Sequence, residues 1–202
     1  CESDIMRLEN TSRGDGIVAL VQPIKDRQKI AELKMELLKR NYKYYILCII
    51  GLNTGLRIGD IIPLKVEDVR NKSHITLREE KTNKIKVFPI NPQLRSELDK
   101  YTSGMENHEY LFPSRQRNRD GVRSHITRVQ AYRYIKNVAE ELGIENFGMH
   151  SFRKSFGYFY YQETKDIVKL MQIFNHSSQN VTRRYIGLTQ EEIDESLENF
   201  FL

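Results

Sequence analysis

The sequence has few cysteines and no long apolar segment. Its two cysteines, Cys1 and Cys48, are too few for a disulfide framework, and Cys48 lies in an apolar run typical of a buried residue. No run approaches the roughly 18 apolar residues of a membrane span, and the first residues show no signal-peptide pattern. We therefore expect a reducing, cytoplasmic setting and no membrane partner.

Motifs for bound metals and nucleotides are also missing. The sequence contains no H-x-x-x-H, no C-x-x-C, no acidic triad suited to Mg²⁺ and no G-x-x-x-x-G-K-[ST] loop. These absences predict a protein that needs no metal and no other cofactor.

Positive charge is concentrated in the middle of the chain. Of the 32 basic and 27 acidic residues, 30 basic but only 18 acidic ones lie in 23–188, because both ends are acidic. Such a basic body favours a polyanion as partner, although a solvated, lysine-rich surface is an equally good interpretation.

Hydrophobic spacing predicts a mainly α protein with a small antiparallel β-sheet, an α+β fold. Residues 1–22 are rich in turn formers and predict an N-terminal extension or linker, and 23–202 predict one domain. Between Ser114 and Arg123 a polar, arginine-rich loop is expected. A first helix is expected after Pro23, with Ile30, Leu33, Leu37 and Leu38 as its apolar stripe and Asp26 near its start as a possible cap. Further helices are expected at about 42–53, 58–62, 94–98, 126–142, 150–162, 166–174, 178–185 and 190–199, and strands at 74–78, 84–90 and 109–113.

Two arginines stand where helices are expected to begin. Arg57 follows a glycine turn in TGLRIGD, where the N–H groups of a guanidinium can point at a phosphate. Asp60 lies on the same helical face and can hold the Arg57 side chain in place. His150 and Arg153 are three residues apart and share one face of a later helix. Taken alone, the pair Arg57 and Asp60 is better explained as a surface arrangement, and such an arrangement is also plausible for His150 and Arg153.

Tyr185 follows His176 by nine residues, near the end of the chain. A lone helical tyrosine is more often a core residue than a reactive one, so the position by itself indicates little. The combination and order of the polar residues carry more weight. That series is Arg57, Lys81, His150, Arg153, His176 and Tyr185.

This series resembles the active-site signature of the tyrosine recombinase (phage integrase) family. TGLRIGDI is similar to the first arginine box, HSFRKSFGYFYYQ to the second, IFNHSSQNVTRRYI to the segment with the nucleophile, and EEKTNKIKVFPI to the β-hairpin that holds a lysine. The resemblance spans about 23–188. Lys81 fits the family spacing better than Lys84 or Lys86, and Asn175 stands where many relatives have glycine.

The resemblance implies a two-step transesterification on DNA. Arg57 and Arg153 would hold the scissile phosphate, and His176 would donate a further hydrogen bond to it. Tyr185 would attack the phosphorus atom with help from His150 in proton transfer.

Lys81 would protonate the departing 5′ oxygen. The product is a 3′-phosphotyrosyl intermediate, which conserves the energy of the phosphodiester and needs neither ATP nor a metal ion.

Further DNA contacts are expected along the basic stretch from Arg115 to Lys136, chiefly from Arg115, Arg123 and Arg128, where a solvated surface is the alternative. Thr82 and Lys84 at the hairpin tip are also candidates for contacts with DNA.

The resemblance also implies partners. These are double-stranded DNA, further copies of the chain in a tetramer on DNA, and an N-terminal core-binding domain for which residues 1–22 are too few, so a fragment is expected. The helix at about 190–199 packs either on its own domain or on a neighbouring protomer. The resemblance also implies a bacterial or phage protein that acts at the nucleoid. Its task would be to integrate or excise a mobile element. A type IB-like topoisomerase and a non-catalytic DNA-binding module are the rival hypotheses.

Overall fold

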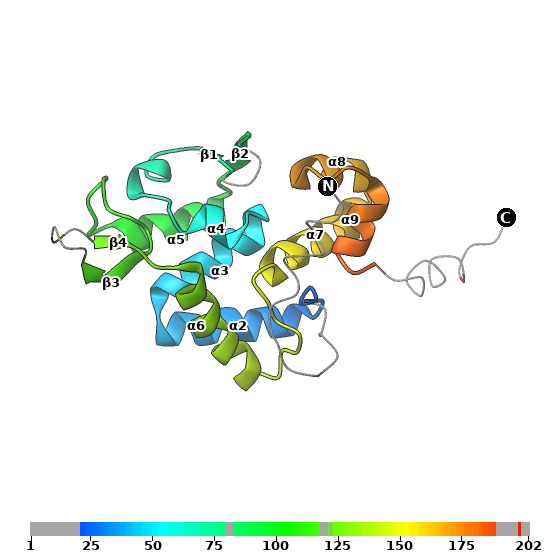
Figure 1. Cartoon of the computed structure of the whole chain (residues 1–202), viewed down its shortest axis with the longest axis horizontal. Coiled ribbons are helices and arrows are strands. Elements are labelled where there is room, and N and C mark those ends of the chain that lie inside the picture. Colours follow the sequence, from blue (N-terminus) through cyan, green and yellow to red (C-terminus); the bar gives the residue numbers. More distant parts are fainter. Residues whose placement is uncertain (1–20, 80–82, 118–120, 122, 189–197, 199–202) are drawn as a thin grey trace.

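The computed structural model describes residues 21–79, 83–117, 121, 123–188 and 198. These residues form a mostly helical fold with two small antiparallel hairpins, which confirms the expected fold class (Figure 1). The elements are α2 (Arg27–Arg40), α3 (Tyr42–Thr54), α4 (Ile58–Ile61), the 3-10 helix η1 (Val66–Asp68), β1 (His74–Arg78), β2 (Ile85–Pro89), α5 (Pro92–Thr102), β3 (Pro113–Arg117), β4 (Arg123–His125), α6 (Arg128–Glu141), α7 (Ser151–Thr164), α8 (Ile167–Phe174) and α9 (Gln179–Tyr185).

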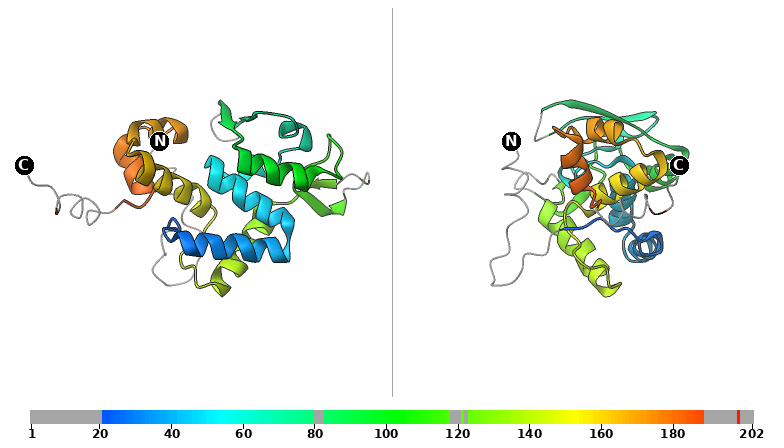
Figure 2. Two further views of the ribbon diagram at one scale, coloured as in Figure 1. Left: turned by 180° about the vertical axis from the view of Figure 1, so that it is seen from behind. Right: turned by 90° about the vertical axis from the view of Figure 1, so that its right-hand side faces the viewer.

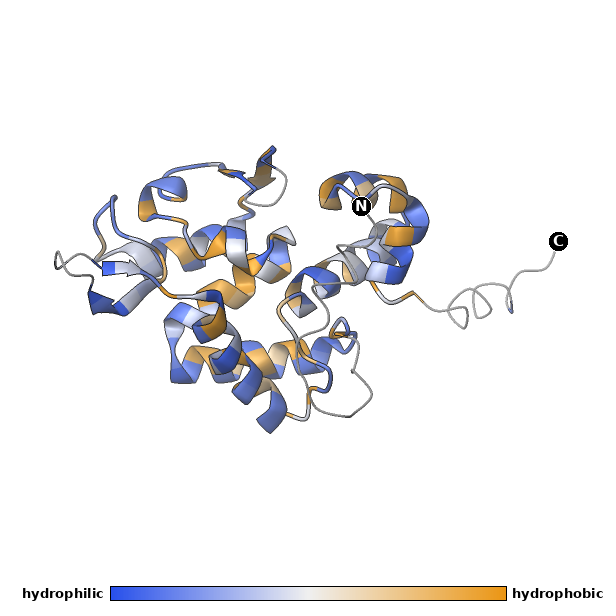
Figure 3. Ribbon diagram, in the orientation of Figure 1, coloured by the Kyte–Doolittle hydropathy of each residue, from blue (hydrophilic) through white to orange (hydrophobic). Residues whose placement is uncertain are grey.

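Helix α3 forms the centre of the core. It packs against α2, α5 and α7, and its residues 46–51 are all buried. The ribbon of α3 is coloured mostly as hydrophobic (Figure 3). A helix that is apolar on every side must be covered on every side, which explains its central place. Asn41 caps its start through the Lys43 N–H group, and Gly55 ends it in the left-handed conformation, as the sequence predicted.

Helix α2 shows how closely the sequence pattern fixes an element. The Asp26 carboxylate accepts hydrogen bonds from the backbone of Gln28 and Lys29, which confirms the predicted cap. Leu33 and Leu37 of the predicted stripe are fully buried. No helix in the described ranges is long and apolar enough to cross a membrane.

Two hairpins replace the single sheet that the sequence suggested. The first pairs β1 with β2 in the predicted place, from His74 opposite Pro89 to Arg78 opposite Ile85. The second pairs β3 with β4, where the sequence predicted a polar loop. That prediction was wrong because β3 is polar after Pro113, so it lacks the alternation of apolar and polar residues that marks a half-buried strand.

Helices α7, α8 and α9 form a smaller body beside the main core (Figures 1 and 2). Ile167, Leu170, Phe174 and Ile186 make its apolar cluster. Gly157 allows α7 to approach closely, since a Cβ atom there would lie 2.7 Å from both Phe174 and Ile186. The helix expected at about 190–199 lies outside the described residues, apart from Glu198.

The start of the described chain is bound to α7. The backbone N–H of Gln22 donates to the carbonyl of Asn146 (3.2 Å), and the Ser151 hydroxyl donates to the carbonyl of Gln22 (2.9 Å). Further along, the N–H of Ile24 donates to the Ser155 hydroxyl (2.7 Å). Residues 21 and 22, which the sequence placed in the extension, therefore contact the domain, and 1–20 lie outside the described residues.

Candidate active site

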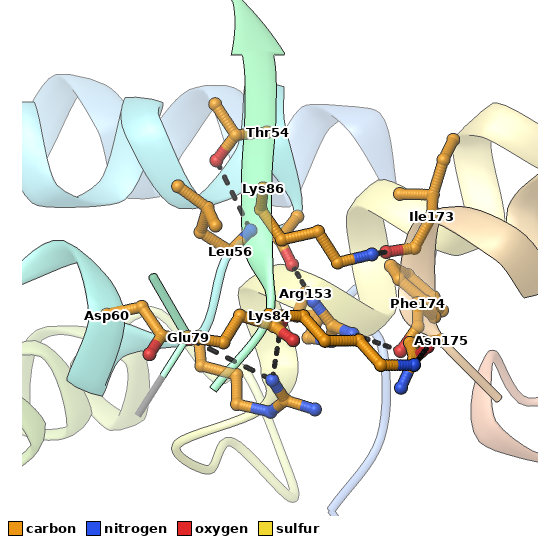
Figure 4. Close-up of polar contacts among 12 residues, drawn as sticks. Thr54, Leu56, Asp60, Glu79, Lys84, Lys86, Arg153, Ile173, Phe174 and Asn175 are labelled. Atoms are coloured by element: carbon orange, nitrogen blue, oxygen red, sulfur yellow. Dashed lines mark hydrogen bonds and ion pairs between the residues drawn. The ribbon is translucent and has the colours of Figure 1, made fainter. Parts of the chain in front are cut away.

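The site lies where the end of α3, the start of α7 and the turn between α8 and α9 meet the first hairpin (Figure 4). Gly55 makes the turn that leads into it, with φ at +64°. A Cβ atom at Gly55 would lie 2.4 Å from the ring of Phe156 on α7, so the close approach as well as the conformation requires glycine.

Arg57 sits at the N-cap of α4, as predicted, and is held by two carboxylates. Its guanidinium lies 2.7 Å from the Glu79 carboxylate and 3.8 Å from that of Asp60. Asp60 therefore takes the predicted bracing position, while Glu79 is the nearer partner and only 1% exposed. Sequence reasoning missed Glu79. The alternation of the strand could have indicated that Glu79 is buried. Every second residue faces inward, and Ile75, Leu77 and Glu79 are spaced in this way.

Arg153 is buried and clamped between two segments. Its guanidinium donates to the carbonyl of Gly55 (2.6 Å) and to that of Phe174 (3.0 Å), and it lies over the Phe174 ring. Burial lowers the pKa of Arg153 from its ordinary value, yet a guanidinium stays charged in proteins. The two carbonyls come from elements far apart in sequence, so Arg153 ties the two arginine boxes to the end of α8.

His176 lies in the turn after α8, where Asn175 adopts the left-handed conformation. Burial lowers the pKa of His176 to about 4, and the positive charges of Arg153 and Arg57 act in the same direction. The imidazole is therefore neutral at pH 7. Its Nδ1 lies 3.1 Å from the Thr182 hydroxyl on α9.

Tyr185 is the last residue of α9 and its ring is packed between both histidines and Phe174. Its hydroxyl lies 3.3 Å from Nδ1 of His150, which stands at the N-cap of α7. Its ring centroid is 5.0 Å from that of His176 and 5.5 Å from that of Phe174. The structure thus brings together five of the six residues predicted to be catalytic.

The sixth, Lys81, lies outside the described residues, as does Thr82. Two other hairpin lysines attach the hairpin to the end of α8 (Figure 4). Lys84 donates to the Asn175 side chain (2.8 Å), and Lys86 donates to the carbonyl of Ile173 (3.0 Å). Burial lowers the pKa of Lys86, and the nearby cations lower it further.

The predicted DNA-contact residues Arg115, Arg123 and Arg128 lie on β3, on β4 and at the start of α6, and all three are exposed. Among the residues that the structure describes, no cluster of three or more histidine, cysteine or acidic side chains is placed to hold a metal ion.

Solved structures with this fold are recombinase catalytic domains. The chain aligns with the crystal structure of XerA recombinase at a TM-score of 0.68 and 21% identity, covering 93% of this chain and 66% of that one. It aligns with the catalytic domain of bacteriophage HP1 integrase at a TM-score of 0.58 and 19% identity, covering 88% of this chain and 95% of that one. The fold is therefore that of a tyrosine recombinase catalytic domain.

Sequence comparison shows the family directly. The model of the phage integrase family matches residues 26–192. A probable integrase/recombinase of Bacillus subtilis (strain 168), YoeC, is 45% identical over 172 residues, covering 85% of this chain and 92% of that protein. Tyrosine recombinase XerA of Pyrococcus horikoshii is 28% identical over 160 residues, which cover 78% of this chain but 55% of that protein. This chain belongs to the phage integrase family, whose members are enzymes that cut and rejoin DNA strands.

Proposed function

We propose that this chain cuts and rejoins double-stranded DNA through a 3′-phosphotyrosyl intermediate formed on Tyr185, as a site-specific recombinase. The observation that carries the proposal is the Tyr185 hydroxyl 3.3 Å from Nδ1 of His150, in a cluster that also holds His176 and two arginines. A tyrosine hydroxyl has an ordinary pKa of about 10, so it needs such a base and an electrophile whose charge is neutralised.

Arg57 and Arg153 hold the scissile phosphate in this scheme. Two of the five N–H groups of Arg153 donate to carbonyls. These hydrogen bonds fix the orientation of the guanidinium plane before DNA binds. Arg57 is oriented by Glu79 and supported by Asp60. Preorganised donors of this kind stabilise the charge that builds up on the phosphate in the transition state.

The histidines have separate tasks. For the neutral imidazole of His176 to donate to a phosphate oxygen, its Nε2 must carry the proton. Nδ1 then accepts from the Thr182 hydroxyl, whose single proton must turn to it from the Ser178 carbonyl, 3.2 Å away. For His150 to accept the proton of Tyr185, its Nδ1 must be the unprotonated nitrogen. Both assignments require neutral imidazoles, and the lowered pKa of His176 supports this for that residue.

The remaining assignments extend the same proposal. Lys81 protonates the 5′ leaving oxygen, and Thr82, Lys84, Arg115, Arg123 and Arg128 contact the DNA backbone. Solved structures with this fold include XerH bound to its difH substrate and a Tn1549 transposon integrase bound to DNA, which supports a DNA partner and a mobile element as the natural context. A tetramer on DNA, an N-terminal core-binding domain and action at the nucleoid belong to this proposal. Neither ATP nor a metal ion takes part.

A suicide substrate tests the proposal. Duplexes with a randomised core are nicked near the cleavage point, so that the short 5′-hydroxyl product diffuses away and the covalent adduct accumulates. We expect an adduct on a denaturing gel with the unchanged chain and with the control variant Tyr160→Phe, but none with Tyr185→Phe. An adduct with Tyr185→Phe, or none with the unchanged chain, contradicts the proposal.

A further inference from the structure

Lys154 is a buried cation beside the tyrosine. It follows Arg153 on α7 and is only 3% exposed. Its ammonium group lies over the Tyr185 ring, 5.1 Å from the ring centroid. The same group donates a hydrogen bond of 2.7 Å to the carbonyl of Val21, in the segment bound along the start of α7.

Burying an ammonium group costs free energy because the charge loses its contact with water, unless nearby groups stabilise it. Lysine is therefore almost never fully buried without a partner. The carbonyl of Val21 supplies one hydrogen bond to the Lys154 ammonium group. The ring of Tyr185 supplies a π face when neutral and a negative charge when ionised. The ammonium is therefore placed to gain more from the phenolate than from the phenol.

We propose that Lys154 is a positioning residue that stabilises the phenolate form of Tyr185 and so promotes its attack on DNA. The inference rests on the proposed role of Tyr185. In the step concerned, the Tyr185 O–H bond breaks, its proton passes to Nδ1 of His150, and the oxygen lone pair forms the bond to phosphorus. The bond from phosphorus to the 5′ oxygen breaks in the same step, and that oxygen leaves with the proton that the proposed function assigns to Lys81. Lys154 keeps all its protons and contributes only its charge.

Other groups face Tyr185 and act on the same equilibrium. His150 contacts the hydroxyl from the start of α7, His176 contacts the ring from the turn before α9, and the charge of Arg153 acts on Tyr185 from α7. The contribution of Lys154 must therefore be measured as a difference between variants that leave these three residues unchanged.

Three substitutions separate charge from hydrogen bonding. Lys154→Arg keeps both the charge and a donor, Lys154→Gln keeps a donor for the Val21 carbonyl but loses the charge, and Lys154→Met loses both while keeping a similar length. If Lys154 only anchors Val21, the Gln variant behaves like the unchanged chain. If its charge acts on Tyr185, the Gln and Met variants behave alike.

The first readout needs no DNA. Tyrosine labelled with ¹³C at Cζ is titrated by NMR, and the Tyr185 resonance is identified by its loss in Tyr185→Phe. We expect the Tyr185 midpoint to rise by about one pH unit in the Gln and Met variants, and to stay near that of the unchanged chain in the Arg variant. Each unit corresponds to about a tenfold change in the phenolate fraction.

The second readout is the pH dependence of adduct formation on the suicide substrate. Below the midpoint we expect the Gln and Met variants to react about tenfold more slowly, with the profile displaced to higher pH and the Arg variant close to the unchanged chain. Equal midpoints and equal profiles for Lys154 and Lys154→Gln overturn the inference. If the NMR midpoints shift but the unchanged chain forms no adduct, the proposed function fails while the electrostatic role of Lys154 stands.

Discussion

The substitution Gly55→Ala tests most sharply how the fold positions Arg57 and Arg153. Two costs are expected. A left-handed conformation costs an L-residue about 1–2 kcal/mol. The new methyl group would also lie 2.4 Å from the ring of Phe156, and overpacking of a tightly packed core costs about 1–3 kcal/mol.

Gly143 supplies the matched control. Its φ of +67° is nearly that of Gly55, but a Cβ atom there would meet nothing within 4 Å. Gly143→Ala therefore carries only the conformational cost, about 1–2 kcal/mol. Gly55→Ala should lower the free energy of unfolding by about 2–5 kcal/mol, and the difference between the variants measures the contact with Phe156.

The assay is equilibrium unfolding in urea with adduct formation measured in parallel. The Gly55 carbonyl accepts from Arg153 and stands two residues before Arg57, so Gly55→Ala should also reduce adduct formation under conditions where the variant is still folded. Equal destabilisation by the two alanines would refute the close contact between the end of α3 and α7. Unchanged adduct formation would refute the positioning argument.

Three further predictions concern the polar groups around the site. Because the pKa of His176 falls from 6.5 to about 4 on folding, the unfolded state binds more protons between those values, so stability should fall as pH falls from 6.5 to 4. Urea unfolding should show a loss of about 1–2 kcal/mol, allowing for solvent screening, and this loss should vanish in His176→Gln. Glu79→Gln, which weakens the buried pair with Arg57, should destabilise the fold by about 1–3 kcal/mol in thermal or urea unfolding. The control Glu163→Gln breaks the exposed pair with Arg27 and should cost about 0–1 kcal/mol. Equal costs for the two variants would contradict the buried pairing. Thr182→Val preserves shape but removes the hydroxyl 3.1 Å from Nδ1 of His176, so adduct formation should slow about tenfold, and an unchanged rate would argue against that tautomer.

Much of the fold follows from local chemistry. Apolar spacing predicted α3 and α7 to α9 to within about two residues, and it predicted the apolar stripe and the cap of α2, because each helix buries one face or, for α3, every face. The second hairpin could not be predicted in the same way. β3 is polar after Pro113, so no alternation of apolar and polar residues marks it, and its pairing with β4 depends on the chain returning at the right place.

The sequence indicated candidate residues of the site but not the groups that hold them. The order of the motifs pointed to Arg57, Arg153 and Tyr185. The groups that hold them are backbone carbonyls and residues from other elements. No sequence pattern indicates that Gly55 and Phe174 clamp Arg153, because this contact exists only after α7 has packed against α3 and α8.

The central claim is that Tyr185 becomes covalently bonded to DNA, and peptide mass spectrometry tests it most directly. Trypsin cleaves after Arg184 and finds no basic residue beyond it, so the last peptide, 185–202, contains Tyr185 as its single tyrosine. After the suicide reaction and nuclease digestion, this peptide should carry the mass of a 3′-linked nucleotide. A nucleotide on any other peptide, or an adduct that leaves 185–202 unmodified, would contradict the account.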